Sequence, residues 1–224
     1  MRVLRILTTF GLLSAMAWPA TAQTTYTCFG LEATILGTPE DDELWGTNGI
    51  DVMAAFGGND LVVGDRRRDF MCGGAGNDFM SGGGSGDSLD GSTGADYLTA
   101  SEGNDTLIGG DGDDYFQTYS GDDRAYGGPG NDVFDILDAN SNDHTHDVIH
   151  GGPGNDKVYS QGDGGGSDDL YGDDGDDRLD STAGTLGSEA GGPDLVDGGE
   201  GYDKCFVDAV DEVLNCEDVR VVIK

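Results

Sequence analysis

The chain has 224 residues, of which 44 are Asp or Glu and 11 are Lys or Arg, so its formal net charge is −33 at pH 7. Such a charge disfavours nucleic acid as a partner, because the phosphate backbone would be repelled. No apolar segment approaches the roughly 20 residues of a transmembrane helix. Composition alone, with 41 Gly among the acidic residues, would indicate a disordered acidic linker.

Residues 1–22 have the pattern of a secretory signal peptide. Arg2 and Arg5 supply the basic region, residues 6–17 an apolar run, and Ala20-Thr21-Ala22 a small-residue cleavage pattern. Cleavage would leave Gln23 first and change the net charge from −33 to −35, because two Arg are lost. We therefore expect a secreted protein, outside the cell, in the periplasm or on the cell surface, whose residues 23–36 form an N-terminal cap.

Residues 37–206 form a repeat array in which Asp recurs every nine residues from Asp42 to Asp132 and, after three short insertions, at 147, 156, 168, 177, 194 and 203. The copies at 73–81, 109–117 and 127–135 match the nonapeptide G-G-x-G-x-D-x-U-x. The eighth position is apolar in every copy, and this strict phase argues against disorder. These residues are Leu44, Met53, Val62, Met71, Met80, Leu89, Leu98, Leu107, Phe116, Ala125, Phe134, Ile149, Val158, Leu170, Leu179, Val196 and Cys205.

Each nonapeptide predicts a six-residue turn followed by a three-residue strand with its middle side chain facing inward. Two nonapeptides complete one coil, so the predicted fold is all-β, a right-handed parallel β-roll solenoid of about eight coils with short terminal caps. The core is a thin apolar ribbon between two sheets. Since the charge and the Gly content oppose folding, a bound hard divalent cation is expected to offset them.

The repeats resemble the RTX, or haemolysin-type, calcium-binding repeats, which form a parallel β-roll, and the resemblance covers roughly residues 37–206. It implies calcium ions between the loops of successive coils, held by sixth-position carboxylates and by backbone carbonyls of the Gly-rich positions. The implied carboxylate ligands are Asp60, Asp78, Asp96, Asp114, Asp132, Asp156, Asp177 and Asp203, with Asp87 and Asp105 on the opposite edge. The implied Gly positions are Gly73, Gly74, Gly76, Gly109, Gly110, Gly112, Gly127, Gly128 and Gly130.

Alternate loops should lie on opposite edges of the solenoid. Edge A is defined by the loops that end at Asp42, Asp60, Asp78, Asp96, Asp114, Asp132, Asp156, Asp177 and Asp203, and edge B by the remaining loops. Edge A holds nearly all the well-formed copies, whereas edge B holds the degenerate copies and all three insertions. The tightest calcium sites are therefore expected on edge A.

Two edge B segments suggest additional roles. The loop with Arg66, Arg67 and Arg68 is expected to hold no ion; its guanidinium groups either pair with Asp51 and Asp87 or form a solvated basic loop. The three His residues, His144, His146 and His150, suggest either a site for zinc, copper or nickel or a polar insertion.

The four Cys residues fit an oxidising compartment. A solenoid of about eight coils at roughly 4.8 Å per coil separates its ends by far more than the 7 Å that a disulfide tolerates between Cα atoms. We therefore expect Cys28 to pair with Cys72 and Cys205 with Cys216, each stapling one end, and residues 207–224 to form a C-terminal capping strand.

No catalytic motif stands out, and we expect no enzyme activity. The sequence favours a secreted calcium-binding β-roll that acts as a structural or interaction module, with calcium-coupled folding and extracellular polysaccharide or cell-surface components as candidate partners. The alternatives are a hydrolase or polysaccharide-modifying enzyme, which a clustered acid and aromatic set on one sheet would favour, and a glycan- or ice-binding adhesin. A regular outward ladder would favour the adhesin, but the seventh positions Phe79, Ser88, Tyr97, Thr106, Tyr115 and Arg124 are mixed.

Overall fold

The computed structural model describes residues 25–137, 145–160, 166–182 and 192–222. The predicted signal peptide, His144 and most of the three insertions lie outside these ranges. Every regular element in the described chain is a β-strand, which confirms the all-β fold class. The described chain holds no helix that is long and apolar enough to cross a membrane.

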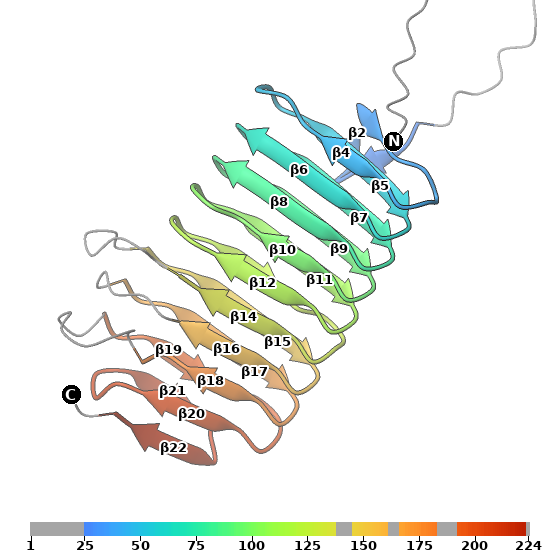
Figure 1. Cartoon of the computed structure of the whole chain (residues 1–224). Helices are drawn as coiled ribbons and strands as arrows, with labels where there is room; N and C mark the ends of the chain where they lie inside the picture. Colours follow the sequence, from blue (N-terminus) through green and yellow to red (C-terminus); the bar gives the residue numbers. More distant parts are fainter. Residues whose placement is uncertain (1–24, 138–144, 161–165, 183–191, 223–224) are drawn as a thin grey trace, which may run out of the picture.

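Two parallel sheets of ten strands each lie back to back and form a long solenoid (Figure 1). The even sheet consists of β4 (Glu43–Trp45), β6 (Leu61–Arg66), β8 (Phe79–Gly84), β10 (Tyr97–Thr99), β12 (Tyr115–Thr118), β14 (Val133–Ile136), β16 (Lys157–Ser160), β18 (Arg178–Asp180), β20 (Lys204–Val207) and β22 (Asp218–Val221). The odd sheet consists of β3 (Ile35–Leu36), β5 (Val52–Gly57), β7 (Phe70–Ala75), β9 (Ser88–Thr93), β11 (Thr106–Asp111), β13 (Arg124–Tyr126), β15 (Val148–Pro153), β17 (Asp169–Asp174), β19 (Leu195–Asp197) and β21 (Glu212–Leu214).

Consecutive strands alternate between the sheets, so each coil contributes one strand to each. Register is kept at one coil per 18 residues in the regular part: Leu98 pairs with Met80 on one side and with Phe116 on the other. The solenoid makes about nine turns, compared with the eight expected from the nonapeptide count. The additional strands β3, β21 and β22 lie outside the Gly- and Asp-rich repeats, which is why the count missed them.

The apolar ribbon predicted from the eighth positions forms the core. All seventeen of these side chains are buried, from Leu44 at 8% exposure to Cys205 at 0%. The rings of Phe116 and Phe134 stack inside it with centroids 4.4 Å apart. Because each coil adds only two such residues, every core side chain depends on the coils above and below it.

Both predicted disulfides are present. Cys28 is bonded to Cys72 with Cα atoms 5.7 Å apart, and Cys205 to Cys216 with Cα atoms 6.1 Å apart. The second bond joins β20 to the terminal coil, as expected. The tail contains two strands, β21 and β22, one in each sheet, instead of a single capping strand.

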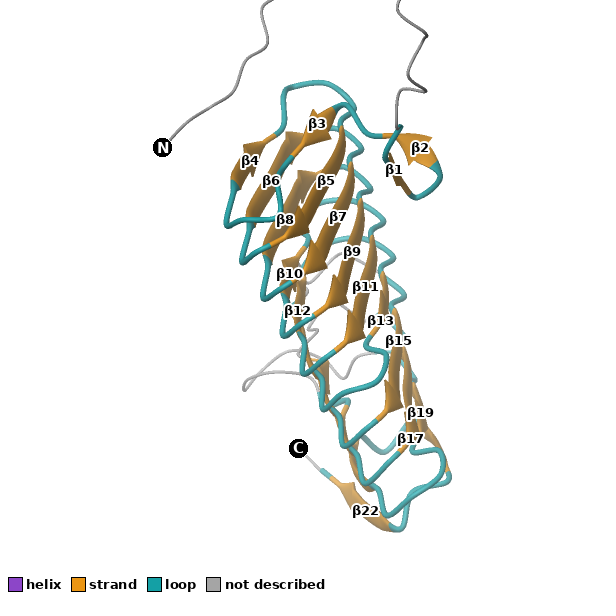
Figure 2. Cartoon of the chain, turned by 90° about the vertical axis from the view of Figure 1, so that its right-hand side faces the viewer, coloured by secondary structure: helices purple, strands orange, loops and turns teal. Residues whose placement is uncertain are grey.

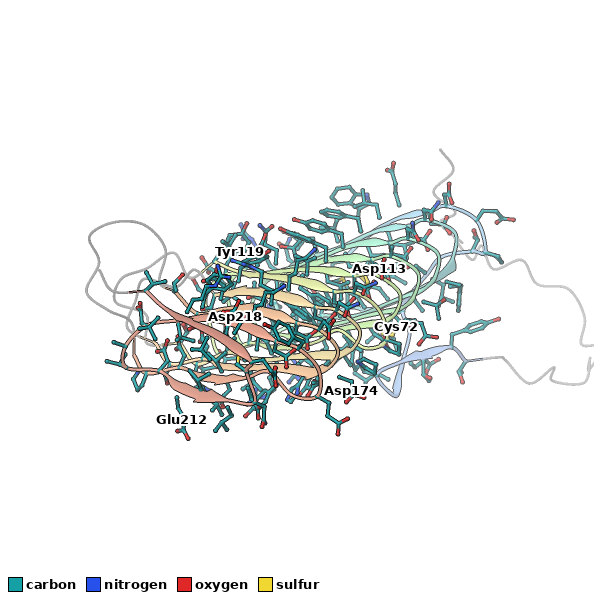
Figure 3. All side chains as sticks on the ribbon, turned by 90° about the horizontal axis from the view of Figure 1, so that it is seen from below. Cys72, Asp113, Tyr119, Asp174, Glu212 and Asp218 are labelled. Atoms are coloured by element: carbon teal, nitrogen blue, oxygen red, sulfur yellow. A yellow bond between two sulfur atoms is a disulfide. The ribbon has the colours of Figure 1, made fainter. Side chains whose placement is uncertain are left out.

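The N-terminal hairpin packs on the side of the solenoid, ahead of the end strand β3. β1 (Thr27–Cys28) and β2 (Leu31–Glu32) form an antiparallel hairpin that packs against β5 and β7 on the outside of the odd sheet (Figure 2). Cys72 points outward from β7 to reach the hairpin, beside which it lies in Figure 3. Tyr26 packs on Phe56 and Phe29 faces Phe70. This disulfide therefore fastens the hairpin to a sheet face.

The outward seventh positions form separate columns, which corrects the mixed ladder inferred from the nine-residue count. Phe79, Tyr97 and Tyr115 share the outer face of the even sheet, and their rings stack with successive centroids 4.9 Å apart. The intervening Ser88, Thr106 and Arg124 belong to the odd sheet. Consecutive strands belong to opposite sheets, so a count of every ninth residue mixes the outer faces of both sheets. Residues on one face recur every 18 residues.

Candidate metal centre

The sixth-position Asp residues form two continuous columns, one along each edge. On edge A, each backbone N–H donates to Oδ1 of the corresponding Asp in the next coil at 2.7–2.9 Å, from Asp42 through to Asp203. The edge B column runs in the same way at 2.6–3.1 Å from Asp51 to Asp194. These columns confirm which loops share an edge, including those that flank the insertions.

The second oxygen of the same carboxylates has a different environment. Oδ2 is buried and has no hydrogen-bond partner within the described chain in every predicted ligand, on edge A in Asp60, Asp78, Asp96, Asp114, Asp132, Asp156, Asp177 and Asp203 and on edge B in Asp87 and Asp105. A buried acceptor without a donor is costly. The repetition of this feature along the solenoid indicates a common partner.

In the edge A loops that end at Asp78 to Asp203, the first Gly keeps the space in front of Oδ2 open. A Cβ on Gly109 would lie 2.2 Å from Oδ2 of Asp114 and 2.8 Å from the carbonyl oxygen of Gly127 in the next coil. The corresponding Cβ distances to Oδ2 are 2.2–2.6 Å at Gly73, Gly91, Gly127, Gly151, Gly172 and Gly198. Only a residue without a side chain fits there, and a carboxylate and a carbonyl oxygen both border the space.

Gly is favoured at the second and fourth loop positions for a different reason, although Phe56, Ser92 and Asp173 hold the second position of other edge A loops with positive φ. Gly110 has φ +105° and Gly112 has φ +143°, a backbone region that residues with a Cβ rarely adopt. A Cβ on Gly112 would also meet the carbonyl oxygen of Gly94 at 1.8 Å. The Gly-x-Gly spacing therefore sets the loop shape and the close stacking of coils.

The electrostatics of the edge A column favour a bound cation. Burial raises the pKa of Asp114 and Asp177 to about 7 and that of Asp132 to about 8. The backbone hydrogen bond to each carboxylate opposes this increase, and the negative charge of neighbouring carboxylates adds to it. Carboxylate and carbonyl oxygens are the ligands of hard ions such as calcium. A positive ion beside Oδ2 would stabilise the ionised form and offset the burial.

Individual loops depart from this arrangement. On edge A, Asp60 follows Ala55 and Phe56 at the first and second positions, so its loop has no Gly at either. On edge B, Gly46, Gly64 and Gly82 keep the first position open in the early coils. Beyond them it is occupied by buried Ala100, Thr118, Ile136, Ser160, Ser181 and Val207.

In two of these later loops, the first-position residue is a Ser whose hydroxyl group donates a hydrogen bond to a carboxylate. Ser160 donates to Oδ2 of Asp168 at 2.6 Å, and Ser181 donates to Oδ2 of Asp211 at 2.9 Å. A neutral donor therefore satisfies these carboxylates. The difference between the edges is thus graded: edge B resembles edge A in its first coils and loses the open position from Ala100 onward.

The arginine loop does not form the predicted ion pairs. Within the described chain, no ion pair involves Arg66, Arg67 or Arg68. Arg68 lies over the ring of Phe70, 5.1 Å from its centroid, and the exposed Arg66 and Arg67 line an open hollow with Ser85, Ser101 and Glu102. The guanidinium groups lie at the surface, whereas the carboxylates of Asp51 and Asp87 are buried.

His146 and His150 contact different acidic residues. His146 contacts Asp169 at 3.3 Å, while His150 contacts Asp173 at 3.2 Å and is stacked between Tyr126 and Tyr171. The described chain contains no cluster of three or more His, Cys, Asp or Glu side chains arranged for a metal ion.

Two features escaped the sequence analysis. The columns end on Glu217, whose Oε2 accepts from the N–H of Asp203 at 2.9 Å, and on Asp211, whose Oδ1 accepts from Asp194 at 3.2 Å. Fifth-position side chains form an outer ladder on edge A: Asn77 N–H donates to Asn59 Oδ1, and Asn155 N–H to Asn131 Oδ1. The recurrent Asn at this position was the available signal. Asp113 and Asp174, also on edge A loops, are labelled in Figure 3.

Comparison with known proteins agrees with this geometry. No curated protein matches the chain. The family model for the RTX calcium-binding nonapeptide repeat matches residues 36–71, 63–98, 81–116, 99–134, 145–163 and 163–185, which together exceed half of the chain. With its Asp columns, its open Gly positions and these matches, the chain belongs to the RTX calcium-binding nonapeptide repeat family.

Proposed function

We propose that this protein is a secreted structural or interaction module whose β-roll folds when calcium binds. The observation that supports this most strongly is the row of buried Oδ2 atoms on edge A, which have no donor in the described chain and, from Asp78 onward, face open Gly positions. The proposed carboxylate ligands are the eight edge A residues named above, with Asp87 and Asp105 as weaker ligands on edge B. Carbonyl groups of the Gly-rich positions would complete the coordination.

The energetic argument concerns the state without calcium. The described chain buries sixth-position carboxylates at 0–7% exposure along both edges, in a molecule that carries a net charge of −33. Ionised carboxylates that are desolvated and close to one another destabilise the compact state. Calcium that binds only the folded chain adds its binding free energy to folding.

Titration of the mature chain with calcium, followed by circular dichroism, tests the proposal. We expect a coil spectrum in chelator and a β spectrum after calcium is added, with a midpoint between about 10⁻⁶ and 10⁻³ M. Magnesium should substitute poorly because it prefers strict octahedral geometry. A complete β spectrum in excess chelator at pH 7.5 would contradict coupled folding.

Secretion is part of the proposal and rests on separate observations. The N-terminal 22 residues have the composition of a signal peptide, and both disulfides require an oxidising compartment. N-terminal sequencing of the exported protein should begin at Gln23.

One observation favours a second candidate, a glycan-binding or glycan-modifying face. The outward aromatic column of the even sheet lies beside polar groups: Tyr97 donates to Gln117 at 2.8 Å, and Tyr115 donates to Asp135. This is an acid and aromatic set on one sheet. Binding of soluble polysaccharides to the wild type, compared with Tyr97→Ala and Tyr115→Ala variants, tests it; unchanged binding by both variants would remove this face from consideration.

A further inference from the structure

Both ends of the solenoid leave strands without a neighbour. β3 and β4 are the first strands of the two sheets, β21 and β22 are the last, and each pairs on one side only within the described chain. The β1–β2 hairpin packs on the side of the odd sheet against β5 and β7 (Figure 2). Unpaired strand edges are templates for pairing with another chain.

The backbone groups at the two ends are complementary in position. On either side of β4, the carbonyl of Asp42 and the N–H of Gly46 bond to β6. The backbone N–H and C=O groups of Glu43 and Trp45 therefore point in the opposite direction, toward the open edge of the sheet. At β22, the N–H groups of Asp218 and Val222 bond to the preceding coil. The backbone N–H groups of Val219 and Val221 therefore point toward the open edge at the C-terminal end. Both end strands run in the common direction of the even sheet.

The Asp column on edge A could continue across such a junction. Thr38 donates to Oδ2 of Asp42, whereas Oδ1 of Asp42 has no hydrogen bond within the described chain. In every other step of the column, Oδ1 accepts from the N–H of the preceding coil. At the C-terminal end, Glu217 is the last residue of the column. Its backbone N–H would donate to Oδ1 of Asp42 in the next copy.

The side chains at the ends match in type when the 18-residue register is continued. On the odd sheet, Leu214 at 42% exposure would meet Leu36 at 47%, and Val213 would meet Ile35. On the even sheet, Val219 would cover Leu44 and extend the apolar ribbon. Arg220 would face Trp45, much as Arg178 lies 3.9 Å from the ring centroid of Phe206 within the solenoid.

We propose that the folded protein associates head to tail with copies of itself, β21 and β22 of one copy pairing in parallel with β3 and β4 of the next. Figure 3 looks towards the C-terminal end, with the labelled Glu212 on β21 and Asp218 on β22. Because this contact joins two different surfaces along one axis, it does not close into a dimer and gives linear assemblies.

One pair in this register is unfavourable. Glu43 at the seventh position of β4 would face Asp218 of β22, and like charges opposite each other on strands are destabilising. The acidity of the whole chain also opposes association. The assembly is therefore expected only in calcium, which is proposed to fold the chain and to reduce its charge.

Single-end variants of the mature chain test the proposal by light scattering in millimolar calcium. Leu36→Arg changes only the N-terminal end and Leu214→Arg only the C-terminal end, and both side chains are exposed. Phe79→Arg, at 42% exposure on the outer face of the even sheet, is the matched control. Circular dichroism in calcium establishes that each variant is folded.

We expect the mean mass of the wild type and of Phe79→Arg to rise with concentration, and each end variant alone to need at least about tenfold more protein for the same mass. An equimolar mixture of the two end variants should form pairs and nothing longer, because one intact end remains on each partner. Glu43→Lys should lengthen the assemblies. A monomeric wild type with a complete β spectrum would overturn the proposal, as would end variants that assemble like the wild type. If an end variant does not fold, unchanged assembly by Glu43→Lys overturns it instead.

Discussion

The two oxygens of the buried sixth-position carboxylates have different surroundings. Oδ1 accepts a backbone hydrogen bond and fixes the side chain, as Asp132 does for Asp114 at 2.7 Å. On edge A, from Asp78 to Asp203, Oδ2 faces a first-position Gly. The recurrent Asp is thus a structural link between coils, and on edge A it is also the proposed carboxylate ligand of calcium.

Gly109→Ala should disrupt one site at a position where the backbone does not have a left-handed φ, although the new Cβ would also lie 2.8 Å from the carbonyl oxygen of Gly127. The new Cβ would lie 2.2 Å from Oδ2 of Asp114, so the carboxylate must move away from the shared space. We expect the calcium midpoint of folding to rise about tenfold, which corresponds to roughly 1.4 kcal/mol. Gly84→Ala is the control, because a Cβ there meets nothing within 4 Å. Equal midpoints for the two variants would show that the space in front of Asp114 is not used.

Acid should partly replace calcium. In the calcium-free fold, burial raises the pKa of Asp96 to about 6, Asp114 to about 7 and Asp132 to about 8, above the value of about 3.9 for an unfolded chain. The folded state therefore binds more protons than the unfolded state in this range, and its stability falls as pH rises through these values. In chelator, the β signal in circular dichroism should therefore be larger at pH 5 than at pH 8.

The effect in calcium should have the opposite sign. Calcium requires ionised carboxylates, so protons compete with it and the apparent affinity should fall between pH 8 and pH 5. Circular dichroism in chelator and calcium titrations, both at pH 5 and at pH 8, separate the two effects. A chelated protein whose circular dichroism spectrum is the same at pH 5 and pH 8 would show that these carboxyls do not limit folding.

The loops of the two edges have the same spacing but differ in the residue at the first position. Edge A keeps a first-position Gly from Gly73 to Gly198, while edge B fills that position from Ala100 onward. Where Ser160 donates to Asp168, the protein supplies its own donor. Edge B therefore changes along the chain from an open loop to a packed or hydrogen-bonded one.

Paired Asn substitutions should reveal this difference. Asp114→Asn and Asp105→Asn both keep an acceptor for the preceding N–H and remove the charge. Asp114 faces Gly109, whereas the loop of Asp105 begins with the buried Ala100. We expect Asp114→Asn to shift the calcium midpoint several-fold further than Asp105→Asn. Equal shifts measured by circular dichroism would mean that the edge B loop binds calcium as well as edge A does.

At the scale of the whole molecule, the regular features were predictable and the irregular ones were not. The eighth-position core, the parity of the edges and both disulfides follow from a strict nine-residue count. The count could not place the hairpin, because its contacts between Tyr26 and Phe56 and between Phe29 and Phe70 have no periodicity. It also missed Glu217, since the last coil has neither the Gly nor the Asp spacing of the repeat.

The identical step from one Asp to the next makes the length of this molecule adjustable. Asp78, Asp96 and Asp114 are linked by the same bond across 18 residues, so removing residues 79–96 would let Asp78 donate to Asp114 on edge A and Asp69 donate to Asp105 on edge B, with the remaining links preserved. Removing nine residues would instead transfer every later loop to the opposite edge and interrupt both columns. The solenoid is thus a spacer that can be shortened or extended by whole coils, at about 4.8 Å for each.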